Sequence, residues 1–209
     1  IAPIQVPRIG DLTVDVPLSQ LAALPEGFIG ILSCASMLGG DEQAFWSLSR
    51  KSYALESFAL SRYPVTFGEY LEFLNALAVY DLEQALGRCP RSESSRLITN
   101  VGGEFTLPQH SPFKQPWNPQ WPVFGINWHD ARAFCDWRSS RDNLSIRLPT
   151  SVEWEMAGRG ADERKFPWGN IWEPTFCNNA LENPGAPTLN PVGSHPTDMS
   201  PFGVVDMAG

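Results

Sequence analysis

The clearest helix signal in this chain of 209 residues lies in the stretch Arg147-Leu148-Pro149-Thr150-Ser151-Val152-Glu153-Trp154-Glu155-Met156-Ala157-Gly158-Arg159-Gly160. Pro149 cannot continue a preceding helix, and Thr150 can cap the next one. Glu153 stands at the third helical position, where its carboxylate can accept a hydrogen bond from the amide of Thr150. This capping box predicts a short helix over residues 151–158, which packing against other elements must stabilise.

The aromatic residues of this stretch are expected to anchor the fold. Trp154 and Ala157 should face the interior one turn apart, and Gly158 or Gly160 should end the helix. The chain has eight tryptophans and 19 prolines but only 18% charged residues, which indicates a loop-rich fold pinned by large aromatic side chains. We expect four tryptophans to be largely buried: Trp128, Trp137, Trp154 and Trp168. Replacing Trp154 with alanine would then cost about 3–5 kcal/mol.

Two longer segments carry the same start signal and an apolar face at helical spacing. Thr66 and Glu69 predict a helix over residues 66–79, and Asn127 and Asp130 predict one over residues 128–141 that ends near Asp142-Asn143. His129 falls in the exposed first turn of the second helix, so we interpret it as a solvated side chain rather than a metal ligand.

Strand signals lie mainly before the first long helix. Residues 28–32 and 53–60 should pair as a hairpin around a turn at Gly39-Gly40-Asp41-Glu42, and Leu12 to Val16 alternates like a single strand. Residues 87–120 lack a period and predict a long surface excursion, and little regular structure is expected after residue 160.

Several motifs in order resemble the formylglycine-generating-enzyme family, also called the sulfatase-modifying-factor family. The matching segments are Met37-Leu38-Gly39-Gly40, Arg62 to Tyr70, Trp121-Pro122-Val123, Ala133 to Trp137, Arg147 to Ala157 with Pro167-Trp168-Gly169, Pro191 to Ser194, and Ser200 to Gly209. The resemblance implies an α+β, C-type-lectin-like formylglycine-generating-enzyme fold with two main helices, short strands and many loops. It also implies a domain over residues 26–209 that lacks its C-terminal part, preceded by a strand or linker appendage over residues 1–25. A further segment or a partner is expected to complete this domain.

Composition excludes some partners. A net charge of −8 and a pI near 4.8 argue against binding to nucleic acid or an anionic membrane, since both need a basic face. No apolar run approaches the roughly 20 residues of a membrane helix. The four cysteines, Cys34, Cys89, Cys135 and Cys177, form no Cys-x-x-Cys pair. We favour buried thiols in a reduced, cytoplasmic chain, with a Cys34–Cys177 disulfide as the alternative.

The resemblance also implies a metal site. Family members commonly hold calcium after the Pro-Trp-Gly segment, through an Asn side chain, backbone carbonyls and an acidic residue further on. Asn178 and the carbonyl of Asn179 match the first half of that pattern. The acidic position falls near Pro184, with only Glu182 close to it. The alternative is an Asn-rich turn whose side chains bond their own backbone.

For activity, the resemblance offers two functions. Family enzymes oxidise a sulfatase cysteine to formylglycine with copper(I) held by two cysteines beyond the motifs present here, and copper(I) favours thiolate ligands. None of the four cysteines can be assigned that role by motif. The details resemble more closely the versions attached to bacterial serine/threonine kinases or used as variable ligand-display proteins. We therefore favour a non-catalytic scaffold that binds an unidentified protein or small ligand, with the copper-dependent oxidase as the alternative.

Overall fold

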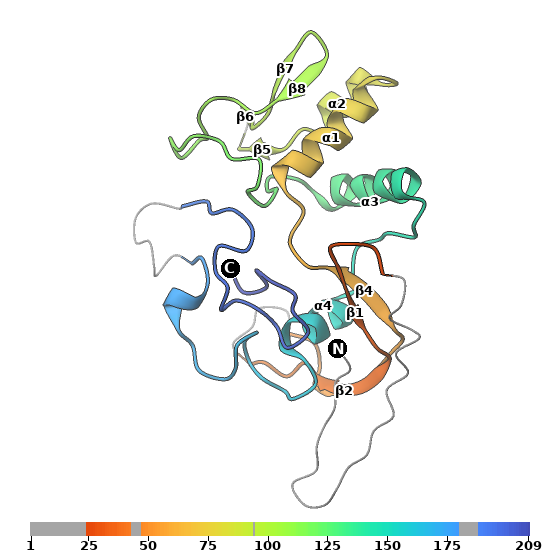
Figure 1. Ribbon diagram of the computed structural model, residues 1–209, viewed down its shortest axis with the longest axis vertical. Coiled ribbons are helices and arrows are strands. Elements are labelled where there is room, and N and C mark those ends of the chain that lie inside the picture. Colours follow the sequence, from red (N-terminus) through yellow and green to blue (C-terminus); the bar gives the residue numbers. More distant parts are fainter. Residues whose placement is uncertain (1–23, 43–46, 94, 180–187) are drawn as a thin grey trace, which may run out of the picture. The chain divides into compact units, whose positions relative to one another are not determined.

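The computed structural model describes residues 24–42, 47–93, 95–179 and 188–209 (Figure 1). The chain forms two compact units. The first comprises the described residues of the segments Ile1–Tyr63, Pro149–Glu182 and His195–Gly209, and the second those of Pro64–Leu148 and Asn183–Ser194. The strand expected over residues 12–16 lies outside the described residues. The predicted α+β class is confirmed, with short antiparallel strand pairs and several helices.

Four strands of the first unit form two antiparallel pairs. Strand β1 (Phe28–Ile31) pairs with β4 (Phe58–Ser61), and β2 (Cys34–Leu38) pairs with β3 (Lys51–Leu55). The single strand predicted over residues 53–60 is therefore wrong, because it divides at Glu56-Ser57 between two partners. At this division the backbone N–H of Ser33 donates to Ser57 Oγ over 2.9 Å.

Helix α4 (Ser151–Arg159) forms as predicted and belongs to the first unit. Thr150 caps it, and the capping box with Glu153 is complete. Met156 and Ala157 are fully buried in the core of this unit. The other buried members of that core are Ile31, Leu38, Phe202 and Val204. Gly160 ends the helix with a φ of 75°, a backbone conformation that favours glycine.

The expected burial of the tryptophans is wrong for two of the four. Trp154 is 50% exposed and Trp128 is 56% exposed, while Trp137 and Trp168 are half-buried. On α4 the buried residues are Glu153, Met156, Ala157 and Gly158. Glu153, Met156 and Ala157 share the face that turns toward the core, and the side chain of Trp154 points away from that face. Trp128 is the first residue of its helix, where it packs on His129 and Arg132 instead of on the core.

The second unit contains the two longest helices, α1 (Phe67–Ala78) and α3 (Trp128–Asp142), both with the predicted capping boxes. Asn143 ends α3 in the left-handed conformation. The sequence reasoning missed a short helix, α2 (Leu82–Gly87), which Asp81 caps through the N–H of Gln84.

The segment predicted to lack regular structure contains two small hairpins. Strand β5 (Arg91–Ser92) pairs with β6 (Ser95–Arg96), and β7 (Thr99–Val101) pairs with β8 (Glu104–Thr106). Asn75 of α1 holds the second hairpin, because its amide donates to the carbonyl of Phe105 and accepts from the N–H of that residue. After residue 160, the only helical turn among the described residues is the 3₁₀ turn η2 (Pro174–Phe176).

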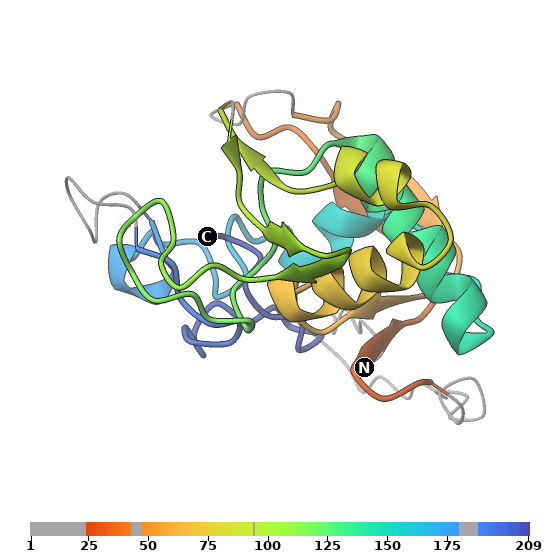
Figure 2. The same cartoon turned by 90° about the horizontal axis from the view of Figure 1, so that it is seen from above.

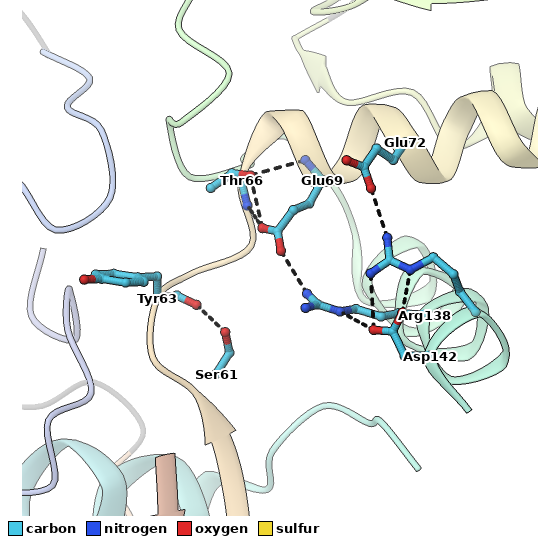
Figure 3. A network of polar contacts seen from close by, with 8 residues as sticks. Ser61, Tyr63, Thr66, Glu69, Glu72, Arg138 and Asp142 are labelled. Carbon is cyan, nitrogen blue, oxygen red and sulfur yellow. Dashed lines mark hydrogen bonds and ion pairs between the residues drawn. The ribbon is translucent and has the colours of Figure 1, made fainter. Parts of the chain in front are cut away.

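Aromatic side chains of α1 and α3 form part of the core of the second unit, where the two helices lie side by side (Figures 1 and 2). Tyr70 stacks on Phe134 at 5.9 Å between ring centroids, and Phe73 meets the edge of the same ring. Arg138 joins the helices at their polar edge by donating to Glu69 over 2.9 Å and to Asp142 over 3.2 Å (Figure 3).

The orientation of α4 gives the first prediction. Replacing Met156 with alanine should lower the free energy of unfolding by about 2–5 kcal/mol, because it empties a buried site. Replacing Trp154 with alanine should lower the free energy of unfolding by only about 1 kcal/mol, since half of that side chain already contacts water. Chemical denaturation followed by circular dichroism compares the two variants on one helix. Equal losses would show that Trp154 belongs to the core.

Candidate functional site

The exposed face of α4 borders a cavity of about 620 Å³ within the first unit. We call it the aromatic cavity, because Trp154, Phe166 and Trp172 form its walls. The remaining lining residues are Asp41, Ser47, Leu48, Pro149, Thr150, Ser151, Glu155, Gly158, Arg159, Lys165, Pro167, Met207 and Ala208. Its volume and its mixture of apolar walls with a few polar groups are typical of a small-molecule site.

A tight turn after α4 supplies the aromatic wall Phe166, and Trp172 follows this turn in the sequence. Phe166 and Gly169 exchange backbone hydrogen bonds of 2.9 and 3.0 Å, and Gly169 has a φ of 145°. Phe166 stacks on Trp168 with centroids 5.4 Å apart and an angle of 11° between the rings. The ring centroids of Trp172 and Phe166 lie 5.3 Å apart, and the rings of Phe176 and Trp168 make an edge-to-face contact. These ring contacts fix the wall before any ligand binds.

The loop after β2 supplies another wall and is tied to α4. The N–H of Gly39 donates to Glu155 Oε1 over 2.7 Å, and the N–H of Gly40 donates to the carbonyl of Leu48 over 2.8 Å. A Cβ atom on Gly39 would stand 2.4 Å from the Leu48 carbonyl oxygen, so no larger residue fits there. Glu155 also forms an ion pair with Arg159 one turn along the helix.

A buried carboxylate positions the wall formed by Met207 and Ala208. Asp198 is almost completely buried, and its Oδ2 accepts the N–H of Ala208 over 3.0 Å. The backbone N–H of Asp206 donates to the carbonyl of Asp198 as well. Burial raises the pKa of Asp198, and hydrogen bonding from the backbone of Ala208 opposes this shift only in part.

The residues predicted to hold calcium lie in the same unit but do not line the aromatic cavity. Asn178 and Asn179 are half-buried, and the Asn179 amide donates to the carbonyls of Pro174 and Cys177 over 2.6 and 2.8 Å. Glu182 and Pro184 lie outside the described residues. Among the described residues, no three His, Cys, Asp or Glu side chains gather as a metal site. Calcium at Asn178 and Asn179 stays a prediction.

The four cysteines form no disulfide with one another, so the alternative of a Cys34–Cys177 disulfide is wrong. Cys89, Cys135 and Cys177 are buried, as expected, whereas Cys34 is half-buried. Burial raises the pKa of the Cys34, Cys89 and Cys135 thiols, so these side chains are protonated at neutral pH. Within the described part of the chain, no helix has both the length and the apolar character needed to span a bilayer.

Sequence reasoning missed the aromatic cavity. The sequence predicts Trp154 in the core and Trp168 as a largely buried anchor, and it assigns no role to Phe166 or Trp172. The helical spacing did contain a signal, because Glu153, Met156 and Ala157 share one face and Trp154 does not. Phe166 and Trp172 could not be placed beside α4 without knowing how the intervening turn folds.

The raised pKa of Asp198 predicts a dependence of stability on pH. The contribution of Asp198 to the free energy of unfolding is greatest below the ordinary pKa of aspartate, about 3.9. This contribution falls as the pH rises through the raised pKa of Asp198 in the folded state. Asp198→Asn keeps the acceptor for Ala208 and removes the charge, so it should be more stable than the parent at neutral pH and equal to it in acid. Denaturation across pH measures this difference.

Asp162 provides the matched control, because Arg164 lowers its pKa instead. Asp162→Asn should lose a small amount of stability at neutral pH and none in acid. If Asp198→Asn behaves in the same way as Asp162→Asn, the account of Asp198 is wrong.

Comparisons with known proteins agree with the motifs and the fold. Over 187 residues the chain is 26% identical to "Inactive C-alpha-formylglycine-generating enzyme 2" of Bos taurus, covering 76% of this chain and 59% of that protein. It is 25% identical to "Formylglycine-generating enzyme" of Thermomonospora curvata, covering 93% of this chain and 72% of that protein. The structure of PvdO from Pseudomonas aeruginosa superposes with a TM-score of 0.60 at 19% identity, covering 86% of this chain and 66% of the other.

The chain thus spans about three fifths of the bovine relative's length. The family model described as "Sulfatase-modifying factor enzyme 1-like domain" matches residues 22–209, nearly the whole sequence. Motifs, fold and family model agree, and the chain belongs to the sulfatase-modifying factor enzyme 1-like domain family.

Proposed function

We propose that this chain is a non-catalytic member of its family that binds a small ligand in the aromatic cavity. The observation that carries the proposal is the exposure of two tryptophans on the cavity walls, 50% for Trp154 and 39% for Trp172. Large aromatic side chains that face a cavity together provide apolar contact area at little cost in conformational entropy. Since Met156 and Ala157 already bury the inner face of α4, Trp154 is available for binding.

The rigidity of the cavity supports this proposal. Trp154 stands on a capped helix, Phe166 and Trp172 belong to a stacked aromatic group, and Asp198 fixes the backbone of Ala208. A site whose walls are held by contacts outside the cavity loses little freedom when a ligand enters.

The state of the thiols supports the non-catalytic assignment. The relatives named inactive and active are equally similar to this chain, at 26% and 25% identity, so overall similarity does not separate the two functions. Copper(I) chemistry of the family's kind needs a pair of thiolates. Burial instead favours the neutral thiol at Cys34, Cys89 and Cys135.

The non-catalytic assignment predicts that the protein forms no aldehyde when incubated with copper(I) and a peptide that carries the sulfatase cysteine motif. Mass spectrometry of the peptide is the measurement, and a formylglycine-generating enzyme serves as the positive control. Aldehyde formation that disappears when the cysteines are replaced by serine would establish the oxidase instead.

The binding proposal is tested with indole-3-acetamide, a neutral aromatic probe. We expect saturation-transfer NMR to detect binding to the parent protein. Trp154→Ala should weaken that binding at least about fivefold, because the lost stacking is worth about 1 kcal/mol or more. Trp128→Ala is the matched control, since Trp128 is equally exposed but belongs to the second unit, and it should bind like the parent. Equal binding by both variants would contradict the proposal.

A further inference from the structure

Resting on the proposed function, we infer that the ligand of the aromatic cavity is a small aromatic carboxylate whose negative charge is recognised by Lys165. Ion pairs neutralise most of the charged side chains around the cavity, and the charge that remains determines which class of ligand the cavity favours.

Most charged side chains in the segment from Glu155 to Lys165 are already in ion pairs. Glu155 pairs with Arg159 one turn along α4. In the turn that follows the helix, Asp162 pairs with Arg164 over 2.6 Å, and Glu163 pairs with Arg50 over 2.5 Å. These three pairs neutralise every charged side chain of the segment except that of Lys165.

Lys165 keeps an available charge at the edge of the cavity. Its ammonium group makes no ion pair with any residue that the structure describes, and its side chain lines the cavity. The backbone of Lys165 is held in place, because its N–H donates to Asn170 Oδ1 over 3.0 Å. Lys165 directly precedes Phe166, so one fixed segment supplies both the cation and part of the aromatic wall.

The carboxylates of the lining do not cancel this charge. Glu155 is neutralised by Arg159. Asp41 stands on the loop after β2, where its exposure lets water screen its charge. A cationic ligand would gain from the tryptophan faces, but it would be repelled by Lys165. A planar ring with a carboxylate satisfies the walls and Lys165 together, and a cavity of about 620 Å³ admits a molecule of that size.

Three probes with the same ring separate the charge from the stacking. Isothermal titration calorimetry at low ionic strength compares indole-3-acetate, neutral indole-3-acetamide and cationic tryptamine. We expect indole-3-acetate to bind about three- to fivefold more tightly than the acetamide, the gain of one partly exposed ion pair, and tryptamine to bind most weakly. Added salt should remove most of this difference.

Variants of the exposed Lys165 identify the cation. Lys165→Met should bring the affinity for indole-3-acetate down to that for the acetamide, while Lys165→Arg keeps the preference. Lys51→Met, a change on β3 outside the cavity lining, should leave the order of the three probes unchanged.

The outcomes distinguish the two proposals. If all three probes bind equally, or if tryptamine binds most tightly, the inferred ligand class is wrong while the aromatic cavity remains a binding site. A preference for indole-3-acetate that survives in Lys165→Met would also overturn the role of Lys165. If none of the probes binds, the proposed function itself fails.

Discussion

The capping box between Thr150 and Glu153 is the interaction on which the first unit depends most. Glu153 Oε2 accepts the N–H of Thr150 over 2.8 Å and its hydroxyl over 3.0 Å, while Thr150 Oγ1 accepts the N–H of Glu153 over 3.2 Å. Because Glu153 is buried, this exchange fixes not only where α4 begins but also which face turns inward. Met156 and Ala157 then enter the core, and Trp154 is left facing the aromatic cavity.

Hydrogen bonds from distant parts of the chain position the other walls of the aromatic cavity around α4. Glu155 accepts a hydrogen bond from the N–H of Gly39 and so holds the loop after β2 against α4. Asp198 accepts a hydrogen bond from the N–H of Ala208 and so holds the C-terminal segment in place. Neither contact contributes a large apolar area. Each uses a charged group to fix backbone, and in this way the walls of the cavity are positioned by groups that do not themselves need to touch a ligand.

The sequence predicted local structure well and side-chain environment less well. Three capping boxes and the ends of the long helices were predictable, since their signals lie within four residues of each other. The division of residues 53–60 between two partner strands was not, because strand pairing depends on residues far away in the chain. Trp154 shows the same limit for the site. Its size suggested the core, but the buried position of Glu153 one residue earlier decided its orientation.

Hydroxyl-radical footprinting read by mass spectrometry measures whether the Trp154 side chain faces the aromatic cavity or the core. Trp154 in the free protein should be oxidised about as fast as the exposed Trp128, and an aromatic ligand should protect Trp154 and Trp172 but not Trp128. Oxidation of Trp154 as slow as that of the buried Trp121 in the free protein would contradict an orientation toward the aromatic cavity, because the tryptophan would then belong to the core.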